Sequence, residues 1–174
     1  MPQLQNFPVA QQQTCNSCWA SAGRAINNWY QMQGWSGANP VYHTDQAFAT
    51  AWANITNNPV NANINIQQSA AAALGDLGYD NNTDDHALPT RDEITEQIND
   101  NRPLLAIVGA TPPNPNPNPH YQNGHWVVIV GISNNQQTLN VFDPDNGNIN
   151  NVAYNQNQYN NNSYWQNTSY VDPQ

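Results

Sequence analysis

The apolar residues in the first part of the chain follow a helical period. From Cys18 onward they recur at steps of three and four residues, the pattern of a helix with one apolar side. The residues of this stripe are Trp19, Ala22, Ile26, Trp29 and Tyr30. Gly34 and Gly37 follow the stripe and predict the end of the helix. Cys18 is therefore expected on the first helical turn.

Further helices are predicted between residues 45 and 103. Asp45 can cap a helix whose apolar residues are Phe48, Ala49, Trp52 and Ile55. Residues 67–74 are rich in alanine, and the glycine that follows predicts the end of that helix. Thr90 and Glu93 have the spacing of a capping box before another helix, which Pro103 ends.

The second half of the chain has the pattern of β-strands. The predicted strands are 104–110, 125–133, 138–143 and 149–154, with a turn at 134–135. The aromatic tail, with Tyr164, Trp165 and Tyr170, is expected to lie back on this sheet. We therefore predict an α+β fold for a single domain over residues 1–174, with a helical lobe over about 1–102 and an antiparallel β lobe over about 103–174.

Length and charge exclude several classes of function. A chain of 174 residues suits one domain with a real core, and no apolar run has the length of a membrane span. The net charge is −9, and the basic residues are Arg24, Arg91 and Arg102 alone. Binding to nucleic acid needs Lys or Arg for phosphate contacts, so we expect no nucleic-acid partner. We predict a soluble monomer.

The chain contains no lysine, and two interpretations stay open. A protein that works inside a eukaryotic cell would offer no side-chain amine for ubiquitin attachment. The alternative is a general replacement of charged residues by amides, since Glu93 and Glu96 are the only glutamates and Asn is very frequent. We favour the second interpretation. The apolar periodicity persists between the Asn clusters, so a packed domain is still expected.

Cys18, His125 and Asp143 carry the candidate chemistry. A thiol attacks carbonyls as the thiolate, which a helix N-terminus and a neighbouring imidazolium both favour. His125 stands at the start of a predicted strand, and Asp143 ends the next one. Gln12 precedes Cys18 by six residues, and its side-chain N–H with the backbone N–H of Cys18 would make an oxyanion hole with two donors.

This pattern resembles the papain-like cysteine peptidases. Their signature is a Gln, five intervening residues and Cys-Trp-Ala at the start of the central helix, and here it is Gln12 and then Cys18-Trp19-Ala20. The stretch 124–131, which begins Gly-His-Trp, resembles the block around their histidine. The resemblance covers roughly residues 9–144 and implies a papain-like fold with the nucleophile's helix packed on the sheet.

The third catalytic position departs from the plant enzymes, which have Asn before Ser-Trp. This chain has Asp143-Pro144, which is similar to bacterial branches such as secreted effector proteases and bacteriocin-processing domains. Asp-Pro is also an ordinary turn sequence, and Asn140 is the reserve candidate. The resemblance implies a protein that is secreted or delivered to a target or host cell. The N-terminus has no signal-peptide pattern, and a cytoplasmic location stays open.

The resemblance implies a role for each of these residues. His125 would take the thiol proton and later protonate the leaving group, while Asp143 would fix the ring tautomer. The product of the first half-reaction would be an acyl-enzyme on Cys18, made from a peptide or protein substrate. Trp19 and Trp126 are candidate substrate-binding residues that could shield the ion pair from water, with core packing as the alternative.

Cys15 raises other interpretations of the cysteine pair. A structural zinc site needs two more ligands of suitable spacing, and a thioredoxin-like motif needs a preceding strand; neither is found near Cys15 and Cys18. Cys15 is either free or paired with Cys18, and pairing would switch the enzyme off. The other histidines, His43, His86 and His120, lie in polar stretches, and we predict neither a metal nor a cofactor.

Residues 111–119, Thr-Pro-Pro-Asn-Pro-Asn-Pro-Asn-Pro, predict a stiff polyproline II loop. The loop ends six residues before His125. It is expected either to overhang the active site and restrict substrate entry or to be a solvated spacer.

Three other classes of function share part of this pattern. A transglutaminase or glutamine deamidase uses the same Cys-His-Asp order but generally lacks the upstream glutamine, so Gln12 favours a peptidase. Cell-wall amidases usually have Asp-Cys-Ser-Gly at the nucleophile, which is absent here. An inactive homologue that binds peptides is the alternative outside catalysis, and it is disfavoured because every catalytic position is filled.

Overall fold

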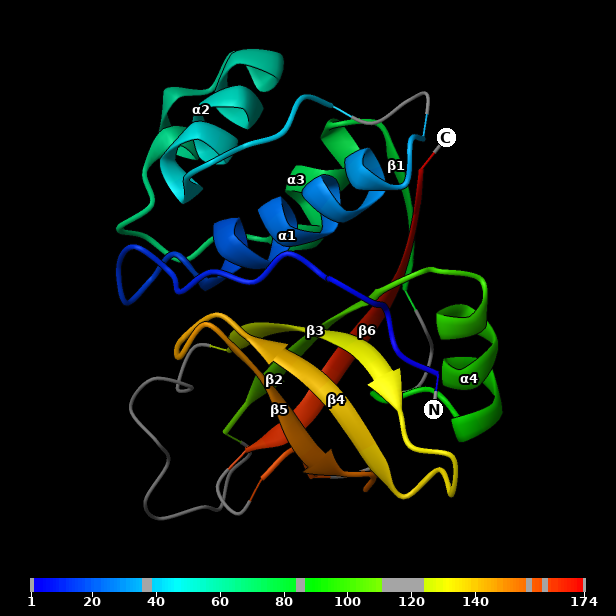
Figure 1. Ribbon diagram of the computed structural model, residues 1–174. Coiled ribbons are helices and arrows are strands. Elements are labelled where there is room, and N and C mark those ends of the chain that lie inside the picture. Colours follow the sequence, from blue (N-terminus) through cyan, green and yellow to red (C-terminus); the bar gives the residue numbers. More distant parts are fainter. Residues whose placement is uncertain are drawn as a thin grey trace.

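A computed structural model describes residues 2–35, 39–83, 87–110, 124–155, 158–160 and 163–173. The helices are α1 (Cys18–Met32), α2 (Asp45–Thr56), the 3₁₀ turn η1 (Pro59–Ala62), α3 (Ala70–Asp76) and α4 (Arg91–Asn99). Helices α1, α2 and α3 gather on one side of a sheet, and α4 lies beside that sheet (Figure 1). Within these described ranges no helix is both long and apolar enough to cross a membrane.

The sheet is antiparallel throughout and has the strand order β1-β6-β2-β3-β4-β5. Its strands are β1 (Tyr79–Thr83), β2 (Leu104–Gly109), β3 (His125–Ile132), β4 (Thr138–Asp143), β5 (Asn148–Ala153) and β6 (Tyr164–Pro173). The predicted α+β fold, with helices first and strands after them, is confirmed. The aromatic tail is β6, an interior strand between β1 and β2, and β1 itself was not predicted.

The helix ends follow local side-chain chemistry. The capping box of Thr90 and Glu93 is present at α4. At α2 the prediction that Asp45 is the cap is wrong. Thr44 accepts from the Ala47 N–H, and Asp45 is the first helical residue, fully buried. Ser69 caps α3, which continues past Gly75 to Asp76 because Gly75 keeps an ordinary helical backbone.

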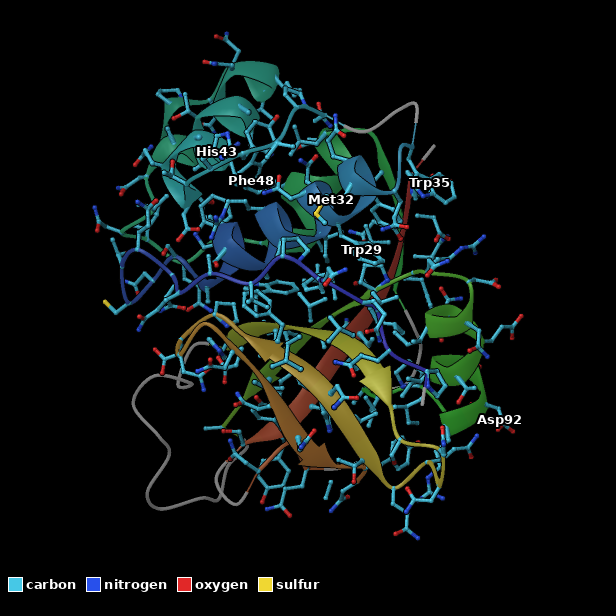
Figure 2. All side chains as sticks on the ribbon, in the orientation of Figure 1. Trp29, Met32, Trp35, His43, Phe48 and Asp92 are labelled. Atoms are coloured by element: carbon cyan, nitrogen blue, oxygen red, sulfur yellow. The ribbon has the colours of Figure 1, made fainter. Side chains whose placement is uncertain are left out.

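Close packing joins α1 to α2 and to the sheet. A β-carbon at position 23 would lie 2.6 Å from Cζ of Phe48, so only a glycine lets this ring approach α1 (Figure 2). On its other side α1 packs against β3, every residue of which is buried. Apolar side chains fill the interface between α1 and the sheet and fix where α1 begins relative to β3.

The N-terminal segment runs between the helices and the sheet (Figure 1). Gln3 forms a bridge to Gly131, and the Leu4 N–H donates to the Val130 carbonyl at 2.8 Å. The pairing of β3 with β4 shifts in register between Ile129 and Gly131, next to this bridge. These contacts lead the chain from β3 toward the start of α1.

Candidate active site

Cys18, His125 and Asp143 each stand at the end of a secondary-structure element. Cys18 is the first residue of α1, His125 is the first of β3 and Asp143 is the last of β4. Because β3 and β4 are antiparallel and Val128 pairs with Phe142, the start of β3 and the end of β4 lie at the same edge of the sheet. The register therefore brings the imidazole and the carboxylate together.

His125 and Asp143 form a buried pair. Nε2 of His125 lies 2.6 Å from Oδ1 of Asp143, and the two residues are 3% and 4% exposed. The same Oδ1 accepts the backbone N–H of Asp145 at 3.0 Å. Because Asp143 takes Nε2, the other ring nitrogen, Nδ1, is left for a further partner.

The Cys18 thiol is that further partner, since it hydrogen-bonds the imidazole. The thiol is 3% exposed, whereas Cys15 is exposed, and both cysteines are free rather than joined in a disulfide. The structure thus brings together the three residues that the sequence singled out for nucleophilic chemistry, in the order thiol, imidazole and carboxylate.

The protonation equilibria of the pair follow from these contacts. Burial lowers the pKa of His125, but hydrogen bonds and charges from Asp143 and Cys18 outweigh it and raise the pKa to about 9. For Asp143, burial raises the pKa, while His125, the Asp145 N–H and the Tyr159 hydroxyl lower it below its usual value. At neutral pH the arrangement therefore favours an imidazolium beside a carboxylate.

Gln12 lies against the turn that follows Asp143. Its backbone N–H donates to the Pro144 carbonyl at 2.8 Å, and Gln11 Nε2 donates to the Asp145 carbonyl at 2.9 Å. A β-carbon at Gly147 would lie 2.7 Å from the Gln11 backbone nitrogen, so the turn and this segment pack backbone to backbone. The half-buried Gln12 side chain is thereby held at the edge of the sheet that carries Asp143.

Tyr159 was not anticipated from the sequence. It is buried, and its hydroxyl donates to Oδ2 of Asp143 at 3.2 Å. Its ring packs edge-on against Trp165 of β6, with centroids 5.1 Å apart. Tyr159 lies in an Asn-rich stretch without periodicity, so no local signal marked it. With the Asp145 N–H and His125, it gives both carboxylate oxygens of Asp143 a donor.

The indoles of Trp19 and Trp126 both donate to carbonyls of one short segment. The Trp19 indole donates to the Ile66 carbonyl at 3.1 Å, and that of Trp126 donates to the Gln68 carbonyl at 3.0 Å. Trp19 is fully buried against Trp52, while Trp126 is 8% exposed. The burial of Trp19 favours core packing over direct contact with a substrate.

The other candidates lie elsewhere. Asn140, the reserve for Asp143, donates to the Asn151 side chain of β5 at 2.7 Å. His43 is exposed, and His86, His120 and the 111–119 loop lie outside the described residues. No group of His, Cys, Asp or Glu suited to a metal ion is found in the part of the chain that the structure describes.

Comparison with protein families gives a match over most of the chain. The family model described as "Papain-like cysteine protease AvrRpt2" matches residues 1–163. A comparison with individually curated proteins gives no match. The matched region contains Cys18, His125 and Asp143, as well as Gln12 and Tyr159.

Proposed function

The chain belongs to the AvrRpt2 family of papain-like cysteine proteases, and from that premise we propose that it cleaves proteins with Cys18 as nucleophile, His125 as general base and acid, and Asp143 as orienting residue. The observation that carries the proposal is that the buried imidazole of His125 has two side-chain partners. The imidazole contacts the Cys18 thiol and, at 2.6 Å, the Asp143 carboxylate. A buried Cys-His-Asp chain of this kind supplies a nucleophile and a proton carrier in contact.

The proposed reaction has two half-reactions. With the thiol proton on His125, the Cys18 sulfur attacks the scissile carbonyl and forms a C–S bond, and the carbonyl π electrons move to oxygen. Collapse of this tetrahedral species breaks the C–N bond, and the imidazolium gives its proton to the leaving amine. Water then attacks the acyl-enzyme with His125 as base, which releases the carboxylic acid and the free thiol.

Asp143 would act by holding the ring. Its bond to Nε2 keeps Nδ1 directed at sulfur, and its charge stabilises the imidazolium. The raised pKa of His125, about 9, supports an imidazolium at neutral pH, and a positive charge beside the thiol favours the sulfur anion.

Gln12 would complete the oxyanion hole together with the Cys18 backbone N–H. The supporting observations are the position of Cys18 on the first turn of α1 and the backbone bond of Gln12 to Pro144. A helix N-terminus has backbone N–H groups without intrahelical partners, which suit a developing negative charge. A side-chain N–H from Gln12 would be the second donor.

Trp19 and Trp126 would shield this site from water rather than bind substrate side chains directly. Each follows a proposed catalytic residue, and their indoles are anchored to Ile66 and Gln68, two residues of one segment. Exclusion of water strengthens the interaction between the imidazolium and the thiolate.

The test compares the protein with its Cys18→Ala variant on a protein substrate and a peptide library, read by mass spectrometry. A cleavage pattern that disappears with the thiol and persists in Cys15→Ser supports the proposal. A gain of about one dalton at glutamine without cleavage would instead identify a deamidase. An intact substrate that still binds would identify an inactive peptide-binding homologue.

The proposed place of action is outside the producing cell or inside a target or host cell. This rests on the resemblance to secreted effector proteases, and the lysine-free sequence is compatible with it. Detection of a tagged chain in culture medium or in recipient cells would support it, and retention in the producing cell would contradict it.

A further inference from the structure

Residues 64–68, which we call the linking segment, lie between η1 and α3 and contact residues on either side of Cys18 and of His125. Four carbonyls of this segment accept a hydrogen bond from a side chain. Around Cys18 the donors are the Thr14 hydroxyl to Ile64 at 2.7 Å, the Asn16 amide to Asn65 at 2.7 Å and the Trp19 indole to Ile66 at 3.1 Å. Next to His125, the Trp126 indole donates to Gln68 at 3.0 Å.

Gln67, the remaining residue of the linking segment, is itself a donor. Its side-chain Nε2 donates to the Gly124 carbonyl. The same nitrogen would lie 3.5 Å from a β-carbon at position 124, where the backbone has a φ of +86°. The carbonyl of Gly124 and the N–H of His125 belong to one planar peptide group. The bond from Gln67 therefore orients the peptide at which His125 begins.

The start of β3 is the part of this strand where an added bond has most effect. In the described part of the sheet, β2 pairs with β3 from His125 onward, whereas the pairing with β4 begins at Val128 and Phe142. Gly124 precedes the strand, and glycine has the widest backbone freedom of any residue. A strand end paired along one side opens locally more readily than a strand interior. The Gln67 bond restrains this end.

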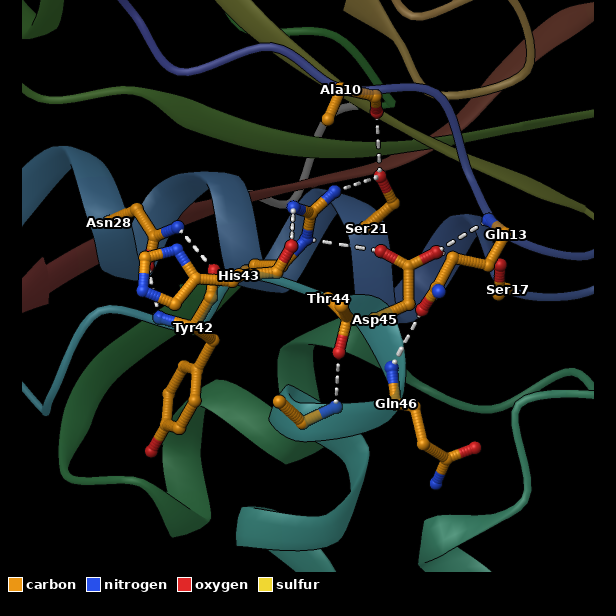
Figure 3. Close-up of polar contacts among 12 residues, drawn as sticks. Ala10, Gln13, Ser17, Ser21, Asn28, Tyr42, His43, Thr44, Asp45 and Gln46 are labelled. Carbon is orange, nitrogen blue, oxygen red and sulfur yellow. Dashed lines mark hydrogen bonds and ion pairs between the residues drawn. The ribbon is translucent and has the colours of Figure 1, made fainter.

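The start of α1, by contrast, is held on its other side by buried polar contacts (Figure 3). The Asp45 carboxylate accepts the Gln13 backbone N–H at 2.8 Å, and Ser17 Oγ lies 2.9 Å from the same oxygen. The second oxygen of Asp45 lies 3.1 Å from Nε of Arg24, so an ion pair joins α2 to α1. The linking segment therefore connects the start of β3 to a firmly held part of the fold.

We propose that Gln67 is a positioning residue of the active site, which sets the imidazole of His125 against the Cys18 thiol through the Gly124 carbonyl. The inference rests on the proposed function of Cys18 and His125. The linking segment binds residues on both sides of Cys18, and Gln67 binds the residue before His125. One short stretch of backbone thus fixes the thiol and the imidazole relative to each other. Misplacement of a reacting group by about 1 Å can cost about 10²-fold in rate.

The test is a mutant cycle on Gln67 and His125 in a Cys15→Ser background, which leaves Cys18 as the one thiol. The measured quantities are the second-order rate constant of alkylation by iodoacetamide near neutral pH, and kcat and KM on a cleaved peptide. Gln67→Met removes the N–H donor and keeps a side chain of similar length. We expect alkylation and kcat to fall about three- to tenfold, with KM changed less, because the imidazolium is less well placed beside the sulfur.

The His125→Ala background identifies the route of the effect. There Gln67→Met should cause no further loss of alkylation, because Gln67 acts on the sulfur only through the imidazole. A loss that persists in that background, or a Gln67→Met variant at the unsubstituted rate, would overturn the proposal. Gln68→Met is the matched control, since Gln68 Nε2 donates to the Val60 carbonyl at 3.0 Å, away from His125. It should keep alkylation and kcat, and a loss equal to that of Gln67→Met would also overturn the proposal.

If near-UV circular dichroism shows a loss of native structure in Gln67→Met, the cycle is repeated with Gln67→Glu. Glutamate has the length of glutamine, and its ionised carboxylate accepts hydrogen bonds but donates none, so the same fall in alkylation is expected. The alkylation measurement needs no peptide cleavage. Cleavage that survives Cys18→Ala would thus sink the proposed function, while the alkylation cycle would still decide the role of Gln67.

Discussion

The backbone N–H of Gln12 donates to the carbonyl of Pro144 across 2.8 Å and so joins the segment before the nucleophile to the residue after Asp143. These positions are far apart in sequence, and the contact brings the start of α1 to the edge where β3 begins and β4 ends. A displacement of this segment would therefore move Cys18 and Gln12 relative to His125 together.

Asp143→Asn should change the pH profile of the enzyme as well as its rate. The carboxylate is a main cause of the raised pKa of His125, about 9, so its loss should lower that pKa. In kcat/KM measured against pH, the alkaline limb should lie near pH 9 in the unsubstituted protein and move toward neutral pH in Asp143→Asn. The maximum should fall about 10²-fold. If the alkaline limb stayed at the same pH in Asp143→Asn, Asp143 would not be a cause of the raised pKa of His125.

The same pair should make folding stability depend on pH at both ends. His125 has a folded pKa raised above 6.5, so its contribution is complete below that value and is lost as pH rises through about 9. Asp143 has a lowered pKa, so its contribution is present above 3.8 and is lost as pH falls through its folded pKa. Urea unfolding followed by tryptophan fluorescence should show both declines. The alkaline decline should be smaller in Asp143→Asn.

Tyr159→Phe should reduce kcat about three- to tenfold, because one hydrogen bond to the charged Asp143 is lost while the ring against Trp165 is retained. Tyr154→Phe is the matched control, since its hydroxyl donates to the Pro89 carbonyl at 3.0 Å. We expect that control to keep its kcat. Equal losses of kcat in the two variants would assign Tyr159 a structural role only. A shift of the alkaline limb of kcat/KM in Tyr159→Phe alone would link Tyr159 to the pair of His125 and Asp143.

The sequence was most informative where local pattern and packing agree. The stripe behind Cys18 predicted α1, and the spacing of Thr90 and Glu93 predicted the capping box of α4. β1 could not be predicted in this way, because Tyr79–Thr83 reads Tyr-Asp-Asn-Asn-Thr and has no alternation of apolar residues. It becomes a strand by pairing with β6, which is a long-range contact.

The candidate site, like the fold, was predictable from the sequence only in part. Motif and order along the chain were enough to single out Cys18, His125 and Asp143, which the structure brings together. Tyr159 reaches Asp143 only through the course of the chain between β5 and β6, and Asp45 was expected to cap α2 but is buried beside Arg24. Partners of this kind depend on tertiary contacts, which no periodicity along the chain encodes.

Gly23→Ala should destabilise the protein by about 1–3 kcal/mol, because its β-carbon would meet the buried Phe48 ring between α1 and α2. Gly75→Ala is the matched control. It lies in α3 with no atom within 4 Å of the new carbon, so it should stabilise by about 0.5–1 kcal/mol. Thermal unfolding of the two variants gives the comparison. A change in stability of the same sign in both variants would contradict the role of Gly23 as the site where α1 and α2 approach closely.

Gln12→Ala should remove one donor of the proposed oxyanion hole and leave the segment in place. The bond that holds this position to Pro144 uses the backbone N–H, which alanine keeps. We therefore expect kcat to fall about 10²–10³-fold, with KM changed far less and thermal stability nearly unchanged.

Gln11→Ala is the matched control, because it deletes an exposed neighbouring amide whose bond to Asp145 is peripheral, and it should keep kcat within about threefold. If the Gln12 amide held only the loop, Gln12→Ala would instead lower kcat and stability together, and it would slow iodoacetamide alkylation of Cys18. A loss confined to kcat, with alkylation unchanged, would assign the amide to the tetrahedral intermediate, because alkylation forms no oxyanion.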